Sequence, residues 1–217
     1  MQNKSLRQKA YEKIKKAIVT LRFEMGKSLN ERELSSELKL GRTPIREALQ
    51  QLANEGLVVI VPRKGAYVST VSLADFQKML DTRFMVETYC ARRAAGKVSN
   101  GDLQRLRELL KGIEPLVAGR DIDGLLTVDR QVHMAIVSCL GNEYIEQIAN
   151  QLYDRVARLW HLSFKNMDAS DLRDRLASHH QILDALDGGD ADASEEAVKR
   201  HIDRFVERIH RNLGSRS

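Results

Sequence analysis

The sequence is poor in residues that cross-link a chain or anchor it in a membrane. It has only two cysteines, Cys90 and Cys139, and both lie inside strongly helical patterns without the spacing of a metal or redox motif. We therefore expect reduced thiols in a core. No apolar run approaches the ~20 residues that a membrane span requires, and the charged N-terminal segment 1–16 has no apolar signal core. These absences predict a cytoplasmic protein with no membrane partner.

Aspartate is missing from the N-terminal third of the chain. Residues 1–70 contain 14 Lys and Arg and 7 Glu but no Asp, a balance of +7, so the remaining residues carry −2 of the net charge of +5. A basic segment joined to a mildly acidic one suggests that the first meets a polyanion and that the second has another task. The length allows two domains with real cores, and we place them at residues 1–71 and 72–217.

The basic segment has the pattern of three helices and a hairpin. Apolar residues recur with a period near 3.6 from Leu6 to Thr20, which predicts an amphipathic first helix. Gly26 then breaks the pattern, and Asn30 can cap a second helix. The stretch "GRTPIREALQQLANEGL" predicts a third helix with Pro44 in its first turn. The run "LVVIVPRKGAYVSTV" indicates a hairpin with a basic tip.

This order of elements, together with the basic charge, predicts a winged helix-turn-helix. In that geometry the third helix enters the major groove of double-stranded DNA with its N-terminal turn leading, and the wing reaches the neighbouring backbone or minor groove. No acidic residue at helical spacing pairs with Arg42 or Arg46, so we take their partners to be on DNA. The alternative is a solvated basic helix beside an ordinary hairpin. The candidate DNA contacts are Arg42, Thr43, Arg46, Arg63, Lys64 and Gly65.

Helical patterns without any strand pattern follow Thr70. The expected helices begin near Ser72 and Asn100 and then cover roughly residues 121–139, 142–164, 168–186 and 191–213. We therefore expect a mainly α protein whose second domain is an antiparallel bundle of about six helices.

Several polar residues of this bundle lie at positions where the helical periodicity predicts buried apolar side chains. Asp129 and His133 share a helix face, and His179 and His201 lie on the apolar stripes of two other helices. One carboxylate and three imidazoles are compatible with a first-row transition metal such as zinc, nickel or manganese. The alternative is a set of ordinary hydrogen-bonded core side chains. The histidines off these stripes are expected at the surface or facing a partner: His161, His180 and His210.

Arg83 is expected among apolar residues of the first bundle helix, where an unpaired guanidinium is costly. One interpretation is an internal salt bridge with Glu87, which is on the same helix face. The other is a receptor for a carboxylate ligand, because the planar guanidinium binds such groups through two parallel hydrogen bonds.

These motifs resemble a known family. "LNERELSSELKLGRTPIREALQQLANEGLV" is similar to the DNA-binding domain of GntR-type bacterial transcription regulators, and "TRFMVE", "DRQVH" and "HHQILDAL" resemble the FadR-like ligand-binding domain known as FCD. The likeness covers nearly the whole chain. It implies a winged helix-turn-helix followed by a helical domain that binds an effector and mediates dimerisation.

The resemblance also implies roles for single residues. It implies that Arg83 binds the carboxylate of an effector and that Asn142 matches a recurrent polar position at a helix start. Among the metals we put zinc first, with nickel and manganese as possibilities. The resemblance places DNA contacts at Arg32, Arg42, Arg46 and Gly65. It places the metal ligands at Asp129, His133, His179 and His201.

Three positions depart from the family pattern. Leu21 stands where a glycine is common, Met25 where a proline is usual, and Gly41 where a serine opens the recognition helix. A serine hydroxyl at this position could cap the helix. Its absence at Gly41 would change operator affinity by no more than about 1 kcal/mol.

Together these features predict a homodimeric, ligand-responsive transcription regulator of the repressor type, and not an enzyme. Two winged domains would bind an inverted repeat, and a small organic acid at the metal would control operator affinity. One alternative is a metal-dependent enzyme, for which the sequence offers no convincing general base. The other is a constitutive DNA-binding protein, which leaves the inward Asp/His set without a purpose.

Overall fold

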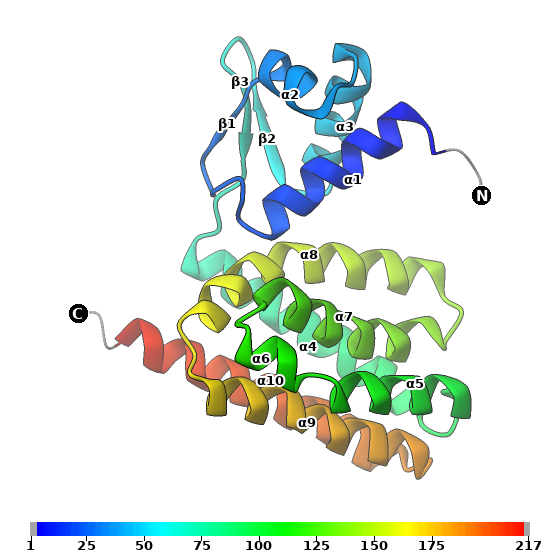
Figure 1. The fold of residues 1–217 in the computed structure, drawn as a ribbon. Helices are drawn as coiled ribbons and strands as arrows, with labels where there is room; N and C mark the ends of the chain where they lie inside the picture. The colour runs from blue at the N-terminus through cyan, green and yellow to red at the C-terminus, as the bar shows by residue number, and fades with distance from the viewer. Residues whose placement is uncertain (1–3, 215–217) are drawn as a thin grey trace. The chain divides into compact units, whose positions relative to one another are not determined.

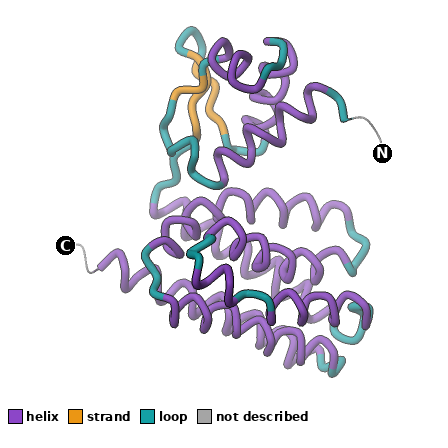
Figure 2. The backbone as a smooth tube through the Cα atoms, viewed as in Figure 1, coloured by secondary structure: helices purple, strands orange, loops and turns teal. Residues whose placement is uncertain are grey.

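The chain folds into two compact units, residues 1–76 and 77–217. The computed structural model describes residues 4–214, with all of their side chains except those of Leu73 and residues 208–214. Within this range, strands occur only in the first unit and the second is helical (Figure 2). The predicted mainly α class is confirmed.

The N-terminal unit is a winged helix-turn-helix, as the sequence predicts (Figure 1). Its small antiparallel sheet has the order β1-β3-β2. The two-residue strand β1, which pairs Ser28 with Tyr67 and Leu29 with Ala66, was not expected. The elements are α1 (Leu6–Val19), β1 (Ser28–Leu29), α2 (Glu31–Leu38), α3 (Arg42–Asn54), β2 (Val58–Val61) and β3 (Gly65–Val68).

The core of this unit forms where the apolar stripes of α1 and α3 meet. Ile14 and Ile18 from α1 and Ile45 and Leu52 from α3 are completely buried. Burying an aliphatic side chain of this size contributes roughly 1.5–3 kcal/mol. This buried stripe fixes which face of α3 remains exposed, and that face carries the arginines.

Local chemistry sets the ends of these helices. Asn30 Oδ1 accepts hydrogen bonds from the backbone N–H groups of Arg32 (2.8 Å) and Glu33 (3.4 Å), which confirms the predicted cap of α2. Gly41 is the N-cap of α3 and makes no side-chain capping bond. Leu21 has a φ of 56°, a left-handed backbone that glycine adopts without strain, which accounts for the glycine common at that position.

The C-terminal unit contains the predicted bundle, and the limits of its long helices agree with the sequence patterns to within about two residues. The one-turn helix α6 was not expected. The elements are α4 (Leu73–Ala94), α5 (Asn100–Lys111), α6 (Glu114–Ala118), α7 (Ile122–Ser138), α8 (Glu143–Lys165), α9 (Ala169–Asp187) and α10 (Ala191–Gly214).

The two units divide within the first turns of α4, between Phe76 and Gln77. This division separates two compact units of the fold. The functional boundary between residues 71 and 72 stays a prediction.

The bundle interior contains charged side chains as well as apolar ones. Trp160, Phe164 and Phe205 are almost fully buried, and so are Arg83 and Asp129. Because a buried charge is stable only with hydrogen-bonding or ionic partners, these residues locate the candidate site.

Candidate metal centre and nucleic-acid interface

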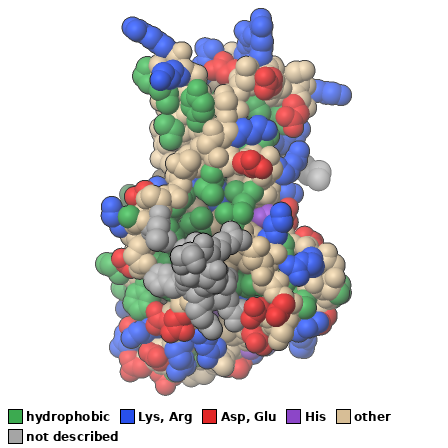
Figure 3. All heavy atoms as spheres, turned by 90° about the vertical axis from the view of Figure 1, so that its left-hand side faces the viewer, with side chains coloured by type: hydrophobic (Ala, Val, Ile, Leu, Met, Phe, Trp, Pro, Cys, Tyr) green, Lys and Arg blue, Asp and Glu red, His purple; other side chains and the backbone are tan. Residues whose placement is uncertain are grey.

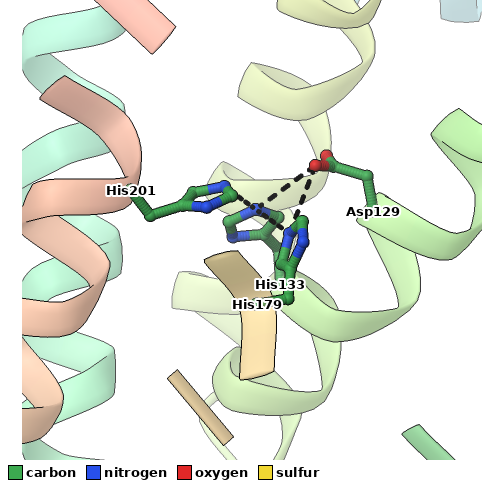
Figure 4. Close-up of side chains that lie close together, drawn as sticks. All are labelled: Asp129, His133, His179 and His201. Atoms are coloured by element: carbon green, nitrogen blue, oxygen red, sulfur yellow. Dashed lines mark hydrogen bonds and ion pairs between the residues drawn. The ribbon is translucent and has the colours of Figure 1, made fainter. Parts of the chain in front are cut away.

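Asp129, His133, His179 and His201 meet inside the helical unit. Each offers one ligand atom, and these atoms all lie within 4.8 Å of one another. The four side chains are at most 1% exposed. Figure 4 shows the carboxylate and the three rings directed at one another from α7, α9 and α10. The structure thus brings together the whole set that the sequence predicts as a metal site.

The three Nε2 atoms and one carboxylate oxygen form the centre of this cluster. His133 Nε2 lies 3.2 Å from His201 Nε2 and 3.4 Å from His179 Nε2. Asp129 Oδ1 lies 3.3 Å from His179 Nε2 and 3.8 Å from His133 Nε2. With metal–ligand bonds of about 2.0–2.1 Å, tetrahedral coordination places neighbouring ligand atoms about 3.3 Å apart. The four separations bracket that value.

Each histidine uses its other ring nitrogen, Nδ1, for a contact directed away from the centre. These contacts are His133 to Glu87 Oε2 at 2.8 Å, His179 to the carbonyl oxygen of Leu176 at 3.1 Å, and His201 to Ser178 Oγ at 2.7 Å. Such partners orient metal-bound histidines and fix their tautomers.

Two of the Nδ1 contacts indicate where the ring hydrogens lie. A carbonyl oxygen accepts but does not donate, so His179 carries hydrogen on Nδ1. The contact of His133 Nδ1 with Glu87 Oε2 has the distance of an ion pair but is not a hydrogen bond, so it does not fix the His133 tautomer. Ser178 Oγ donates to the carbonyl oxygen of Arg175 at 2.6 Å, which leaves the hydroxyl to accept from His201 Nδ1. His179 and His201, when neutral, therefore present an Nε2 without hydrogen to the centre of the cluster.

A cation is the natural partner for nitrogen and oxygen acceptors that converge on one point. Here three imidazole nitrogens and a carboxylate oxygen converge in a buried site. A mixed nitrogen and oxygen donor set suits zinc, nickel or manganese. The residues present therefore fit a divalent transition metal.

The surroundings favour the ionisation states that metal binding needs. Burial by itself raises the pKa of Asp129, but His133, His179 and Arg175 outweigh it and hold the pKa of this carboxyl well below its ordinary value. Burial lowers the pKa of His179 and His201, which keeps the rings neutral.

Tyr153 and Arg175 hold the carboxylate of Asp129 from outside the cluster. The Tyr153 hydroxyl lies 2.8 Å from Oδ2, and Arg175 Nη2 lies 3.4 Å from Oδ1. Burial and the neighbouring Asp129 raise the pKa of Tyr153 well above its ordinary value, so the phenol remains a hydrogen-bond donor. Arg175 Nη1 also donates to the carbonyl oxygen of His201 at 3.1 Å.

Arg83 lies next to this cluster through a shared carboxylate. Its Nε contacts Glu87 Oε1, while Glu87 Oε2 faces His133. The guanidinium also stacks on Trp160, with Cζ 4.2 Å from the ring centroid. The salt bridge considered from the sequence is confirmed. Nevertheless, Nη1 and Nη2 are buried and make no hydrogen bond within the described part of the chain.

Asn142 has a local role in the structure. Its Oδ1 accepts from the backbone N–H groups of Tyr144 (3.1 Å) and Ile145 (3.2 Å), so it caps α8, and its side chain is exposed. An effector contact at Asn142 stays a prediction.

The histidines outside the cluster differ in their surroundings. His161 Nε2 lies 3.1 Å from Asp123 Oδ1, and His180 is half-buried. The side chain of His210 lies outside the described residues.

The candidate DNA contacts of the N-terminal unit are all exposed: Arg32, Arg42, Thr43, Arg46, Arg63, Lys64 and Gly65. In the space-filling view (Figure 3), Lys and Arg side chains project at the top, the end at which Figure 1 shows α2 and the turn between β2 and β3. Arg63 and Gly65 have φ values of 63° and 110°, which turn β2 into β3 and present the wing tip. This surface suits a polyanion.

Arg46 has an acidic partner in the protein that helical spacing does not indicate, and its contact with DNA stays a prediction. Its Nε lies 3.0 Å from Glu31 Oε1, and its Nη2 lies 2.8 Å from Glu31 Oε2. Glu31 opens α2, 15 residues before Arg46, so a search at helical spacing along α3 could not find it. Among the described residues, Arg42 has no hydrogen bond or ion pair of this kind, although its charge acts on Glu31.

The sequence reasoning also missed the residues that orient the ligands. Ser178 immediately precedes His179, and Glu87 was considered only as a partner of Arg83. The tyrosine against Asp129 had no sequence signal, because its contact joins two helices.

Within residues 4–214, no helix combines the length and the apolar character needed to cross a bilayer.

Comparison with protein families gives two matches. Residues 6–68 match the bacterial regulatory proteins of the gntR family, and residues 78–204 match the FCD domain. The first match spans the winged unit and the second contains all four cluster residues.

The similar curated proteins are transcription factors. The HTH-type transcriptional repressor RspR of Escherichia coli (strain K12) is 27% identical over 202 residues, which cover 93% of this chain and 88% of RspR. The HTH-type transcriptional repressor GlaR of the same strain is 28% identical over 199 residues, covering 88% of this chain and 90% of GlaR.

A solved structure shares the complete fold. E. coli McbR/YncC matches with a TM-score of 0.87 at 20% identity, covering 97% of this chain and 100% of that one. At this identity the likeness concerns the fold alone.

Proposed function

The chain belongs to the GntR family of bacterial regulatory proteins and carries an FCD domain, and on this premise we propose that it is a repressor controlled by a small organic acid bound at a metal centre. That it is a DNA-binding transcriptional regulator follows from the family. The metal, the acid, the dimer and the individual contacts are the parts that we propose.

The convergence of three imidazole nitrogens and one carboxylate oxygen on one buried point carries the proposal. We assign a divalent metal to the cluster, with zinc first and nickel or manganese as alternatives. When bound, such an ion would be a Lewis acid whose coordination could expand beyond the four protein ligands to include a carboxylate. Two sets of side chains orient the ligands: Glu87 and Ser178 hold rings, and Tyr153 and Arg175 hold the carboxylate.

Arg83 supports an acid as the effector. Two of its three guanidinium nitrogens are buried without an acceptor among the described residues, and leaving charged donors unpaired in an interior is costly. A ligand carboxylate would satisfy both nitrogens in the parallel geometry that arginine prefers. Because Glu87 contacts both Arg83 and His133, a ligand at Arg83 lies next to the metal ligands.

The relatives argue against an enzyme, because they are transcriptional regulators. Hydrolysis at the metal would also need a general base other than the ligands. Glu87 is a carboxylate outside the ligand set that contacts the cluster, but it is poorly placed as a general base because its two oxygens face Arg83 and His133. Turnover of a carboxylic acid by the purified protein would revive the enzyme alternative.

A thermal-shift screen of small mono- and dicarboxylates, with and without chelator, tests the proposal. An acid that binds only the folded, metal-loaded protein stabilises it by about 2.7 kcal/mol at a concentration of 100 times its Kd. We expect such a shift for at least one acid, its loss with chelator, and release of DNA by the same acid.

Arg83→Lys provides the control for the acid site. It keeps the positive charge beside Glu87 but loses the planar donor pair. We expect full metal content by elemental analysis and a much smaller acid-induced shift. Purified wild type without metal would refute the centre, and an unchanged shift in Arg83→Lys would remove Arg83 from the acid site.

A further inference from the structure

The Glu31–Arg46 pair lies on the proposed DNA-binding surface. Two parallel hydrogen bonds join the guanidinium to the carboxylate, while the Arg46 side chain remains 72% exposed. An ion pair this exposed contributes little to folding, because water screens it. Stability of the fold therefore does not explain why Glu31 and Arg46 are paired.

The pair also borders the space between the recognition helix and the wing. A groove beside it is lined by Glu31 and Arg46 together with Gln50 of α3 and Lys64 and Gly65 at the wing. A duplex held by both α3 and the wing passes this groove. Glu31 is therefore an acidic residue within a surface that otherwise attracts phosphates.

The geometry of the pair leaves half of the guanidinium available. Nε–H and one hydrogen of Nη2 are directed at Glu31. Nη1 and the second hydrogen of Nη2 form the opposite edge. Two parallel donors of this kind match O6 and N7 of guanine in the major groove. A side chain already held on one edge loses less rotamer freedom when the other edge binds.

We propose that Glu31 is a positioning residue for sequence reading: it holds Arg46 so that the free guanidinium edge meets a guanine. This rests on the proposed role of Arg46 as a base contact. The hydrogen bond from Arg46 and the charges of Arg46 and Arg42 lower the pKa of Glu31, so it is ionised at neutral pH. The negative charge of Glu31 opposes binding to the phosphates of DNA of any sequence. The position in which it holds Arg46 favours binding where a guanine is present. Glu31 therefore raises specificity while it lowers nonspecific affinity.

The test compares Glu31→Gln with Glu33→Gln in the full-length chain. Glu33 is exposed on the same first turn of α2 and forms no side-chain ion pair in the described structure, so its variant removes the same charge without touching Arg46. Duplexes are selected from a random pool with the wild type. The Kd values for a selected and an unselected duplex are then measured at one salt concentration.

We expect Glu31→Gln to lower the ratio of the affinity for the selected duplex to the affinity for the unselected duplex about fivefold or more. A repeated selection with this variant is expected to lose the preference for one guanine in each half-site. Glu33→Gln is expected to leave the ratio and the preference unchanged. Equal effects of the two variants, or none, would show that Glu31 is only a surface charge.

Arg46→Ala separates this inference from the proposed contact set. If Arg46→Ala leaves the ratio unchanged, Arg46 is not a base contact and both proposals fail. If it lowers the ratio while Glu31→Gln behaves like Glu33→Gln, only the positioning role is overturned. In the Arg46→Ala background, Glu31→Gln is expected to have no further effect on the ratio; an additional loss would mean that Glu31 acts without Arg46.

Discussion

At the scale of single residues, His179 and His180 show how one position along a helix separates a proposed metal ligand from an ordinary side chain. Successive side chains on an α-helix point about 100° apart. His179 is fully buried with Nε2 towards the cluster, whereas His180 is half-buried outside it. The neighbours therefore form a matched pair for testing the centre.

We predict that His179→Ala loses most of its bound metal, because one of the four ligands and its lone pair are removed. His180→Ala is expected to keep the metal. Elemental analysis of both purified variants measures this, with circular dichroism as a check on folding. Metal loss in His180→Ala alone would show that the ligand set is misassigned on α9.

The four proposed ligands could be predicted from sequence because helical spacing alone shows which side chains face inward. Asp129 and His133 share a face of α7, and the other two histidines stand on apolar stripes. The contacts that orient them could not be predicted. Tyr153 and Ser178 act through hydrogen bonds that depend on how the helices pack and not on spacing within one of them.

At the scale of the elements, the wing depends on a glycine for conformation and not for space. Gly65 has a φ of 110°, yet a Cβ added there would meet no atom within 4 Å. Its cost on substitution is therefore backbone strain alone. Gly41 is needed for neither conformation nor space: its φ is −62°, and a Cβ would make an ordinary 3.5 Å contact with Pro44.

We predict that Gly65→Ala destabilises the β2–β3 hairpin by ~1–2 kcal/mol, because an L-residue is strained in the left-handed region. Amide hydrogen exchange of the hairpin measures the loss, and weaker DNA binding is expected with it. Gly41→Ser is the control, since it offers a capping hydroxyl and is expected to stabilise α3 by a few tenths of a kcal/mol. Unchanged exchange in Gly65→Ala would contradict the strain argument.

The long elements were predictable, and the short ones were not. α9 and α10 carry apolar stripes over many turns, so their limits agree closely with the sequence patterns. The two-residue strand β1 and the one-turn helix α6 are too short to show any period. β1 forms because Ser28 and Leu29 meet the free edge of β3, a contact between distant parts of the chain.

At the scale of the whole molecule, exposed apolar residues on two helices of the C-terminal unit support the proposed dimer. Met85 and Tyr89 on α4 are 70% and 53% exposed, and Tyr144 and Ile148 on α8 are 73% and 47% exposed. Each pair is one helical turn apart. Apolar surface of this kind on a protein proposed to bind an inverted repeat suits a second copy of the chain.

We predict that the wild type has twice the 24.6 kDa mass of one chain in light scattering, and that Met85→Asp/Tyr89→Asp is monomeric. The charges would be buried without partners in the interface. The double variant is expected to keep its metal and to bind an inverted repeat more weakly. Val59→Asp, which alters an exposed apolar residue of β2, is expected to stay dimeric. A monomeric wild type, or a double variant that remains dimeric, would contradict the assignment.

The cluster also has a consequence for the freedom of the chain. His133 lies 46 residues before His179 and 68 before His201, so one bound ion closes two long loops that contain α8 and α9. Closing such loops removes conformational entropy that short-range contacts cannot remove. Metal supply would then set how far α7, α9 and α10 fluctuate apart, and the rigidity of the C-terminal unit would follow the metal content of the cell.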